Sequence, residues 1–410
     1  MKPRLLATLA CLIALLAAPA APRADIGTTI GQLQAMVSGV HLTQDVRHLE
    51  AFDTRFVASV NAPVVVQELY DELVFLGWET GIEEFEVRHP QLGTVASWNV
   101  IARREGTDPG GLVVIGAHWD SIDDTELDGS GTSFDDPEKL APGADDNASG
   151  VAVLLELAQL LGGTSFQHDI EICFFGAEEV GRQGSGFHAA SLADQGATVL
   201  GYLNVDMVGF DVTTHDCTIF HNTASTTLAQ EIEILAETYS PILAETEIIE
   251  GSNSDAWSFW YEGYAGVSIW EGHDHAPHAN DDADTFVNCI TPPFHLAMAK
   301  MVLGVFCHMA GIETVTAAPG AAAPILPRVQ AWPNPFQGAT TLRLAAGAAG
   351  GGRLAVFDAA GRLLRVLETA GGSALWDGRD DRGRRLPAGV YYVRPASGRL
   401  HGSGRVVLLD

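Results

Sequence analysis

Apolar residues follow two patterns between residues 112 and 270. Some runs are apolar almost throughout, which is typical of strands buried on both faces of a sheet. These runs are 112–117, 170–175, 199–205 and 266–270. Elsewhere apolar residues recur at helical spacing, as in 151–161 before Gly162 and in 228–239. Strands that alternate with helices predict an α/β domain: a mixed, mostly parallel sheet covered by helices on both faces.

The pattern changes near the C-terminus. Residues 313–331 are rich in alanine and proline and poor in bulky apolar side chains, which is typical of a linker. Beyond them, short alternating strands such as 353–357 and 390–394 are broken by glycine and aspartate turns. We therefore expect a catalytic domain over 25–312, a linker over 313–331, and a small all-β sandwich over 332–410.

The first 24 residues have the layout of a secretory signal peptide. Lys2 and Arg4 precede an apolar run over 5–18, and Ala18-Pro19-Ala20 offers a cleavage site. The run is too short for an ordinary transmembrane helix, and no later segment reaches the length of a membrane span. We therefore expect an exported protein that is secreted, periplasmic or held at the cell surface, with no transmembrane segment.

Four cysteines follow the expected signal peptide. Cys173 lies in an apolar strand and is expected to be a small core residue. Export would allow a disulfide bond among Cys217, Cys289 and Cys307, but their spacing specifies no pairing.

Charge divides the chain into an acidic body and a basic tail. Residues 24–327 carry 46 acidic and 8 basic side chains, whereas 328–410 carry 12 arginines against 6 acids. The acidic body argues against nucleic acid and anionic membranes as partners, and mildly favours cationic substrates such as free amino termini. Acidity that only keeps an exported protein in solution explains the same counts equally well.

Polar and acidic residues follow several of the predicted strands, where open α/β sheets place their ligands. They are His118 and Asp120, Glu178 and Glu179, Asp206, and His273, His275 and His278. A further pair, Asp145-Asp146, lies in a glycine-rich turn just before the helix at 151–161. Taken alone, such a pair reads as a helix N-cap. Because all these residues reach one edge of the sheet, they predict a metal site instead.

The charges of this set fit a two-metal centre. Asp145, Glu179 and Asp206 would bring three negative charges, and His118 with one later histidine would bring two neutral donors. Two divalent cations and one bridging hydroxide then leave the centre neutral. Mixed histidine and carboxylate ligands suit zinc, with manganese and cobalt as alternatives.

As an ordered set, the motifs resemble the M28 family of dinuclear zinc aminopeptidases over residues 40 to 310. The motifs are His118-x-Asp120, GADDNASG over 143–150, Ala177-Glu178-Glu179 and Val205-Asp206. The resemblance implies an exported metallo-aminopeptidase with two zinc ions per chain, acting on peptides that have a free N-terminus.

The resemblance also implies roles for single residues. The implied metal ligands are His118, Asp145, Glu179, Asp206 and His278. Asp145 would bridge both metals, His118 and Asp206 would complete one site, and Glu179 with His278 the other. His278 is preferred over His275 because Asp284-Thr285 follows it shortly, as in the family.

The catalytic roles follow from the same resemblance. Glu178 would be the general base that takes a proton from the bridging water, and Asp120 would be the carboxylate behind His118. The chain departs from the family at Ser254-Asp255, which is followed by Ala256 where the family often has histidine. The preferred N-terminal residue of the substrate is therefore open.

Two other functions remain open on the same fold. A glutaminyl-cyclase-like acyl transferase would use a single zinc, and a non-catalytic binding ectodomain would be expected to have lost metal ligands. Metal analysis separates the first alternative from the aminopeptidase.

The tail carries a second resemblance. Trp332-Pro333-Asn334-Pro335-Phe336 and the segments at 356–362, 376–380 and 387–392 resemble the immunoglobulin-like domain of flagellar hook-capping proteins and related C-terminal sorting domains. The resemblance implies a domain that engages a secretion or cell-surface component. A passive β-sandwich is the alternative.

Overall fold

A computed structural model of the chain provides the coordinates. It describes residues 26–108, 110–125, 131–251, 254–315, 329–344, 353–358, 362–369, 373–395 and 404–409. The expected signal peptide lies outside the described residues. Among the described residues, no helix is both long and apolar enough to cross a membrane.

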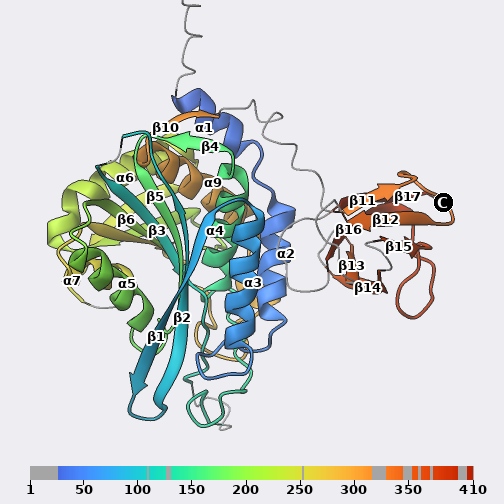
Figure 1. Cartoon of the computed structure of the whole chain (residues 1–410), viewed down its shortest axis with the longest axis horizontal. Helices are drawn as coiled ribbons and strands as arrows, with labels where there is room; N and C mark the ends of the chain where they lie inside the picture. Colours follow the sequence, from blue (N-terminus) through green and yellow to red (C-terminus); the bar gives the residue numbers. More distant parts are fainter. Residues whose placement is uncertain are drawn as a thin grey trace, which may run out of the picture.

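An eight-stranded sheet forms the centre of the larger part (Figure 1). In spatial order its strands are β1 (Glu79–His89), β2 (Gly93–Arg104), β5 (Asp169–Phe175), β3 (Leu112–His118), β6 (Val199–Val205), β9 (Gly266–Glu271), β7 (Asp216–His221) and β8 (Leu243–Ile248). The middle strands β5, β3, β6 and β9 pair in parallel, whereas β1, β2 and β7 join by antiparallel pairing. The expected mixed, mostly parallel sheet is therefore confirmed.

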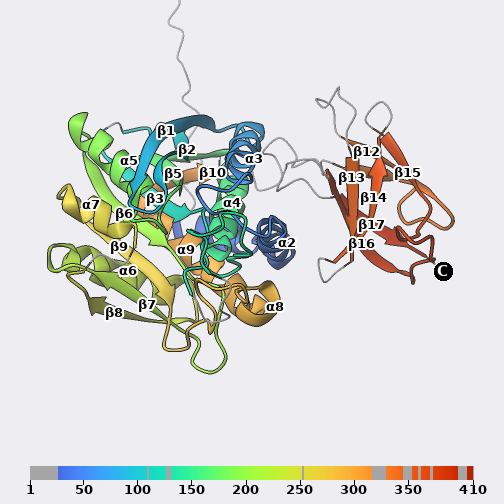
Figure 2. The ribbon, with the colours of Figure 1, turned by 90° about the horizontal axis from the view of Figure 1, so that it is seen from below.

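Helices cover both faces of this sheet (Figure 2). One face lies under α1 (Ile26–Gln34), α2 (Gly39–Glu50), α3 (Ala62–Phe75), α4 (Ala148–Leu161), α6 (Thr226–Tyr239) and α9 (Pro292–Met309). The other face lies under α5 (Gln183–Asp194) and α7 (Ala256–Tyr261). Shorter elements are η1 (Thr223–Ser225), α8 (Phe286–Cys289), and the pair β4 (Thr164–Phe166) with β10 (Ile312–Val315).

The central strands are apolar throughout because both of their faces are buried. In β3, Val113 and Ile115 pack into the larger core under α4, while Val114 between them packs into the core under α5 and α7. Successive side chains of a strand point to opposite faces, so each face needs its own apolar set. This explains why the strand lacks the alternation expected of a half-exposed strand.

The tail forms a separate pair of antiparallel sheets. One contains β11 (Val329–Trp332), β12 (Thr340–Leu344) and β15 (Ser373–Trp376); the other contains β14 (Leu363–Glu368), β13 (Arg353–Phe357), β16 (Gly389–Pro395) and β17 (Gly404–Leu408). A core of its own, centred on Trp376 and Phe336, lies between them. Of the expected linker, residues up to Val315 belong to β10 and residues from Val329 to β11, and 316–328 lie outside the described residues.

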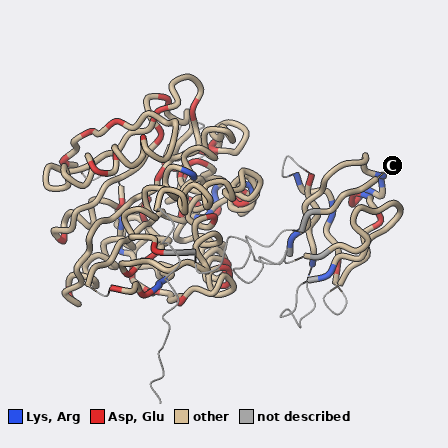
Figure 3. The backbone as a smooth tube through the Cα atoms, turned by 90° about the horizontal axis from the view of Figure 1, so that it is seen from above, with Lys and Arg blue, Asp and Glu red and all other residues tan. Residues whose placement is uncertain are grey.

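Acidic side chains are scattered over the body, and Lys and Arg side chains over the tail (Figure 3). The two parts contact each other at α2. The guanidinium of Arg394 in β16 lies 3.3 Å from Nδ1 of His48, whose Nε2 lies 2.6 Å from a carboxylate oxygen of Glu68. Burial lowers the pKa of Arg394, and the charges of Asp45, Glu68 and Glu72 oppose that shift. The contact therefore pairs opposite charges from the two parts of the chain.

The four cysteines after the expected signal peptide are buried free thiols. Cys217 lies 3.8 Å from the sulfur of Met301 in the core, and Cys173 lies inside β5 as expected. The structure therefore contains none of the disulfide bonds that the sequence left open.

A buried charge network lies under α5. His188 is held between two carboxylates, 3.0 Å from Glu83 at Nδ1 and 2.9 Å from Glu171 at Nε2. Arg103 lies 2.6 Å from the other oxygen of Glu171. Burial alone would lower the pKa of His188, but contacts with Cys173, Glu171 and Glu83 outweigh burial and raise it well above its ordinary value. The imidazolium therefore links β1, β5 and α5.

We predict that His188→Gln lowers the free energy of unfolding by about 3 kcal/mol at pH 6, since it removes the buried cation that lies between Glu83 and Glu171. Because the folded state raises the pKa of His188, its contribution is complete below pH 6.5 and is lost as pH rises through the raised value. Urea unfolding of both proteins from pH 6 to pH 10 should show a shrinking difference. His215→Gln, whose side chain is 75% exposed, is the control, and a pH-independent difference would contradict the assignment.

Candidate metal centre

Three parallel strands and one turn deliver polar side chains to a single pocket. His118 ends β3, Glu178 and Glu179 follow β5, and Asp206 follows β6, so all four lie at the carboxyl edge of the sheet. The pocket has a volume of about 370 Å³. Its lining residues are His118, Asp146, Glu178, Glu179, Asp206, Met207, Trp270, His275, Ala276, Ala279 and Asn280.

His118, Asp146 and Asp206 form the tightest group of candidate metal ligands in the pocket. Nε2 of His118 lies 3.1 Å from Oδ1 of Asp146 and 3.4 Å from Oδ1 of Asp206. One donor atom from each residue falls within 4.8 Å of the others. The imidazole is 1% exposed and the Asp146 side chain 12%, so the group is nearly closed to solvent yet reachable from the pocket.

Asp120 orients this group from behind. Nδ1 of His118 lies 3.2 Å from the carbonyl oxygen of Asp120 and 3.6 Å from its carboxylate. The two carboxylate oxygens accept hydrogen bonds from the backbone N–H groups of Glu178 and Glu179. A single buried side chain therefore fixes His118 and the turn that carries both glutamates, as the sequence suggested for His118 alone.

The structure turns Asp145 away from the pocket, contrary to the expectation that it bridges the metals. Its Oδ1 accepts a hydrogen bond from the N–H of Gly209, and its carboxyl group contacts Glu271. Asp146 takes the place in the pocket instead. The start of helix α4 explains this difference. Asn147 is the N-cap of α4, and its side chain accepts a hydrogen bond from the N–H of Gly150. Asp146 directly precedes this cap and lines the pocket.

Asp145 and Glu271 form a carboxyl pair behind the pocket. Burial and the charge of Glu271 raise the pKa of Asp145 well above its ordinary value, and burial raises the pKa of Glu271 to about 8. Two carboxyl groups in contact avoid repulsion by sharing a proton. Glu271 ends β9, and no sequence pattern pairs it with Asp145.

The backbone of the Asp145-Asp146 turn is held by Asp284. One oxygen of Asp284 accepts from the N–H of Asp145 and the other from the N–H of Asp146, both at 3.0 Å. Burial raises the pKa of Asp284 to about 6, against the opposing effect of these hydrogen bonds. Asp284 therefore acts on the turn and not as a group in the pocket.

Arg55 is a second residue that the sequence did not single out. Its fully buried guanidinium donates to the carbonyl oxygens of Trp119, Leu49, Pro142 and Gly143, at distances between 2.5 and 3.2 Å. Burial lowers its pKa to about 10, and the charges of Asp284, Asp120, Asp146 and Glu179 limit the shift. Its position before the first predicted strand gave no signal of this role.

Glu178 and Glu179 are adjacent carboxylates, and both line the pocket. Burial raises the pKa of both carboxyl groups well above the ordinary value, and the charge of His118 opposes the shift at each. Oε2 of Glu179 accepts a hydrogen bond from the side chain of Asn280, whereas Oε1 is buried without a hydrogen-bond partner. A cation in the pocket would give that oxygen a partner.

The expected ligand His278 does not reach the pocket. Its Nδ1 lies 3.2 Å from Asp281 and its side chain is 38% exposed. His275, the alternative, lines the pocket, but its Nδ1 faces Glu271 at 4.0 Å and the side chain is 59% exposed. The histidines share one loop, and spacing alone does not indicate which of them turns inward.

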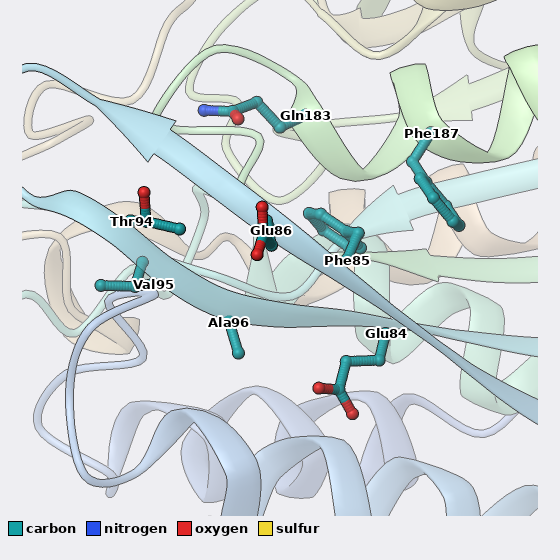
Figure 4. Close-up of a pocket in the computed structure, with 8 residues that line it drawn as sticks. All are labelled: Glu84, Phe85, Glu86, Thr94, Val95, Ala96, Gln183 and Phe187. Atoms are coloured by element: carbon teal, nitrogen blue, oxygen red, sulfur yellow. The ribbon is translucent and has the colours of Figure 1, made fainter.

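A larger hollow of about 740 Å³ lies on the outside of the β1–β2 hairpin, beside α5 (Figure 4). Phe85, Phe187, Glu84 and Glu86 are among its eight lining residues, which include no histidine or cysteine. The size of this hollow does not by itself indicate a catalytic or metal-binding site. The smaller pocket holds the candidate metal centre because imidazole and carboxylate groups meet there with a buried oxygen that lacks a partner, a donor set that suits zinc.

The parallel sheet with this pocket at its carboxyl edge places the protein among α/β metallo-exopeptidases. Residues 99–305, half of the chain, match the sequence profile of peptidase family M28, and the chain belongs to that family.

Relatives in other organisms are named as leucine aminopeptidases. A probable leucine aminopeptidase 2 of Aspergillus fumigatus is 33% identical over 119 residues, which are 29% of this chain and 21% of that protein. A probable leucine aminopeptidase of Arthroderma otae is 30% identical over 203 residues, 47% of this chain and 52% of that one. The matched segments thus span between a fifth and about half of these relatives.

Solved structures share the fold. LapB of Legionella pneumophila superimposes with a TM-score of 0.59 at 20% identity, over 70% of this chain and 76% of that one. A Zn-dependent exopeptidase of Parabacteroides distasonis gives 0.56 at 21% identity, over 66% and 98%. At such identity the likeness establishes the architecture.

We predict that Asp146→Asn weakens zinc binding by more than about 100-fold, because loss of a residue that only supports a ligand already costs 10–100-fold. Asp145→Asn should keep zinc binding within about 10-fold, because an amide can replace the protonated member of a carboxyl pair. Zinc titration of the metal-free proteins measures both. The reverse order would restore Asp145 as the ligand.

We also predict that Arg55→Met lowers the free energy of unfolding by about 3–5 kcal/mol, since four buried carbonyl oxygens lose their donor and nearby carboxylates lose their cation. Arg88→Met is the matched control, because the Arg88 side chain is 78% exposed. Chemical unfolding of the three proteins gives the comparison. Equal stability of both variants would contradict the structural role of Arg55.

Proposed function

We propose that the chain is an exported zinc aminopeptidase that removes N-terminal residues from peptides, with two metal ions and Glu178 as general base. The observation that carries the proposal is the meeting of His118, Asp146 and Asp206 with the Glu178-Glu179 pair in one pocket. Membership of the M28 family and the names of the relatives support it.

The donors divide into two groups around Asp146. His118 and Asp206 would hold one cation, Glu179 would help to hold the second, and Asp146 would contribute to both. Asp146 thus takes the bridging role that the sequence had suggested for its neighbour. Cations bound by these residues would polarise the scissile carbonyl and make water a nucleophile near neutral pH.

Glu178 is the proton carrier of the proposed reaction. Burial raises the pKa of its carboxyl group, and a raised pKa brings a carboxylate closer to the value that a base needs near neutral pH. It would accept a proton from the attacking water and then donate it to the departing amine. The backbone N–H of Glu178 is fixed by Asp120, so the base is held in place while its proton changes.

The size and lining of the pocket favour removal of one residue at a time. A volume of about 370 Å³ is at the small end of ligand pockets, enough for one side chain and the reacting peptide bond. Met207, Trp270, Ala276 and Ala279 give it an apolar wall, whereas the carboxylates favour a cationic amino terminus. We infer a preference for apolar N-terminal residues.

The same proposal includes export and separate roles for three parts of the chain. We propose that 1–24 is a signal peptide, that 25–312 is the catalytic unit, and that 332–410 engages a secretion or cell-surface component. Separate apolar cores in the body and the tail support that division.

We predict that Glu178→Gln lowers kcat for aminoacyl-chromogen hydrolysis by about 10²–10⁴-fold, the usual contribution of a general base. Its metal content should equal that of the unchanged protein, and a chelator should abolish activity of the latter. Undiminished turnover by the variant would exclude Glu178 as the base. One zinc per chain together with cyclisation of N-terminal glutamine would favour the single-zinc acyl transferase.

A further inference from the structure

An asparagine, Asn280, contacts the carboxylate of Glu179 in the pocket. Nδ2 of Asn280 donates a hydrogen bond to Oε2 of Glu179 at 3.0 Å, and both side chains line the pocket. No histidine among the described residues makes a hydrogen bond to Glu179, since His275 faces Glu271 and His278 faces Asp281. The side chain that contacts Glu179 in the pocket is therefore an amide, where the sequence predicted an imidazole.

The backbone holds Asn280 in this place. Its φ of 59° is in the left-handed region, which asparagine adopts more readily than most other residues with a side chain. Its carbonyl oxygen accepts a hydrogen bond from the N–H of Asp124 at 3.2 Å. The side chain is thus presented to Glu179 by a defined turn, and its amide can point either the nitrogen or the oxygen inward by a half-turn of its last torsion.

We propose that the second cation position is an all-oxygen site, formed by Asp146, Glu179 and the amide oxygen of Asn280, and that Mn²⁺, a harder divalent cation, competes better with Zn²⁺ there than at the position beside His118. The buried Oε1 of Glu179, which has no hydrogen-bond partner, supplies the second oxygen. The proposal rests on the proposed function, because it concerns the metals of the same pocket.

The two cation positions then differ in chemistry. The position beside His118 offers an imidazole nitrogen with two carboxylates, a set that suits zinc. The position beside Asn280 offers carboxylate and amide oxygens alone, and such ligands suit manganese and magnesium better than zinc. The centre is therefore a mixed one, with a tightly held zinc and a more exchangeable second ion.

The test measures metal binding to the full chain, independently of activity. Metal-free protein is titrated with Zn²⁺ and with Mn²⁺, followed by calorimetry, metal analysis after dialysis and electron paramagnetic resonance of bound Mn²⁺. We expect one zinc per chain to survive dialysis, and Mn²⁺ to compete for the second position. Two zinc ions of equal affinity, with no competition by Mn²⁺, would overturn the proposal.

Variants of Asn280 identify the ligand. Asn280→Ala should weaken the second equivalent of Mn²⁺ by at least about 10-fold and leave the first zinc unchanged. Asn280→Asp, which keeps an oxygen at the same place, should retain Mn²⁺, whereas Asn280→His should shift the second position toward zinc. His275→Ala is the matched control: loss of the second ion in this variant, with none in Asn280→Ala, would assign the site to His275 and overturn the proposal.

The outcome for the inference is separable from that for the proposed function. If both ions bind as expected but aminoacyl substrates are not hydrolysed, the proposed function fails and the metal assignment stands. If substrates are hydrolysed with two equally tight zinc ions, the aminopeptidase stands and the all-oxygen site is wrong.

Discussion

The pocket depends on one buried guanidinium. Arg55 reaches the end of α2, the residue after β3 and the turn before α4, and binds a backbone carbonyl oxygen in each. These three segments are far apart in the sequence, and the last two carry or flank Asp120, Asp145 and Asp146. A planar group with five donors suits such a junction because it satisfies several acceptors from one point. Its charge also offsets the carboxylates that gather at the same edge of the sheet.

Those carboxylates explain the rest of the arrangement. Acids that are buried together must share protons, accept hydrogen bonds or face a cation, since each uncompensated charge is costly in the interior. Asp145 and Glu271 share a proton. Asp120 and Asp284 accept hydrogen bonds from backbone N–H groups. The acids left to face the pocket are Asp146, Glu178, Glu179 and Asp206. The metal centre is thus the part of a larger acidic cluster whose side chains line the pocket.

The sequence predicted the centre of the fold better than its edges. The four continuous apolar runs became β3, β5, β6 and β9, because strands buried on both faces have a composition that local pattern can detect. It gave no signal for β1, in which most side chains are exposed and glutamates are frequent. The same limit applied to the site: strand ends identified His118, Glu178, Glu179 and Asp206, but a turn of adjacent acids could not say which of Asp145 and Asp146 faces inward.

The directions of the side chains in the loop after β9 could not be predicted from the sequence, for a physical reason. Residues at the end of a buried strand are aimed by the sheet, whereas those in a loop are aimed by turns and hydrogen bonds that no period reveals. His278 was preferred because Asp284-Thr285 follows it shortly, yet its ring contacts Asp281 outside the pocket. Asn280 reaches Glu179 because a left-handed turn brings it there. A donor set is therefore decided by backbone conformation as much as by the presence of suitable side chains, and imidazoles nearby in sequence do not make a zinc site by themselves.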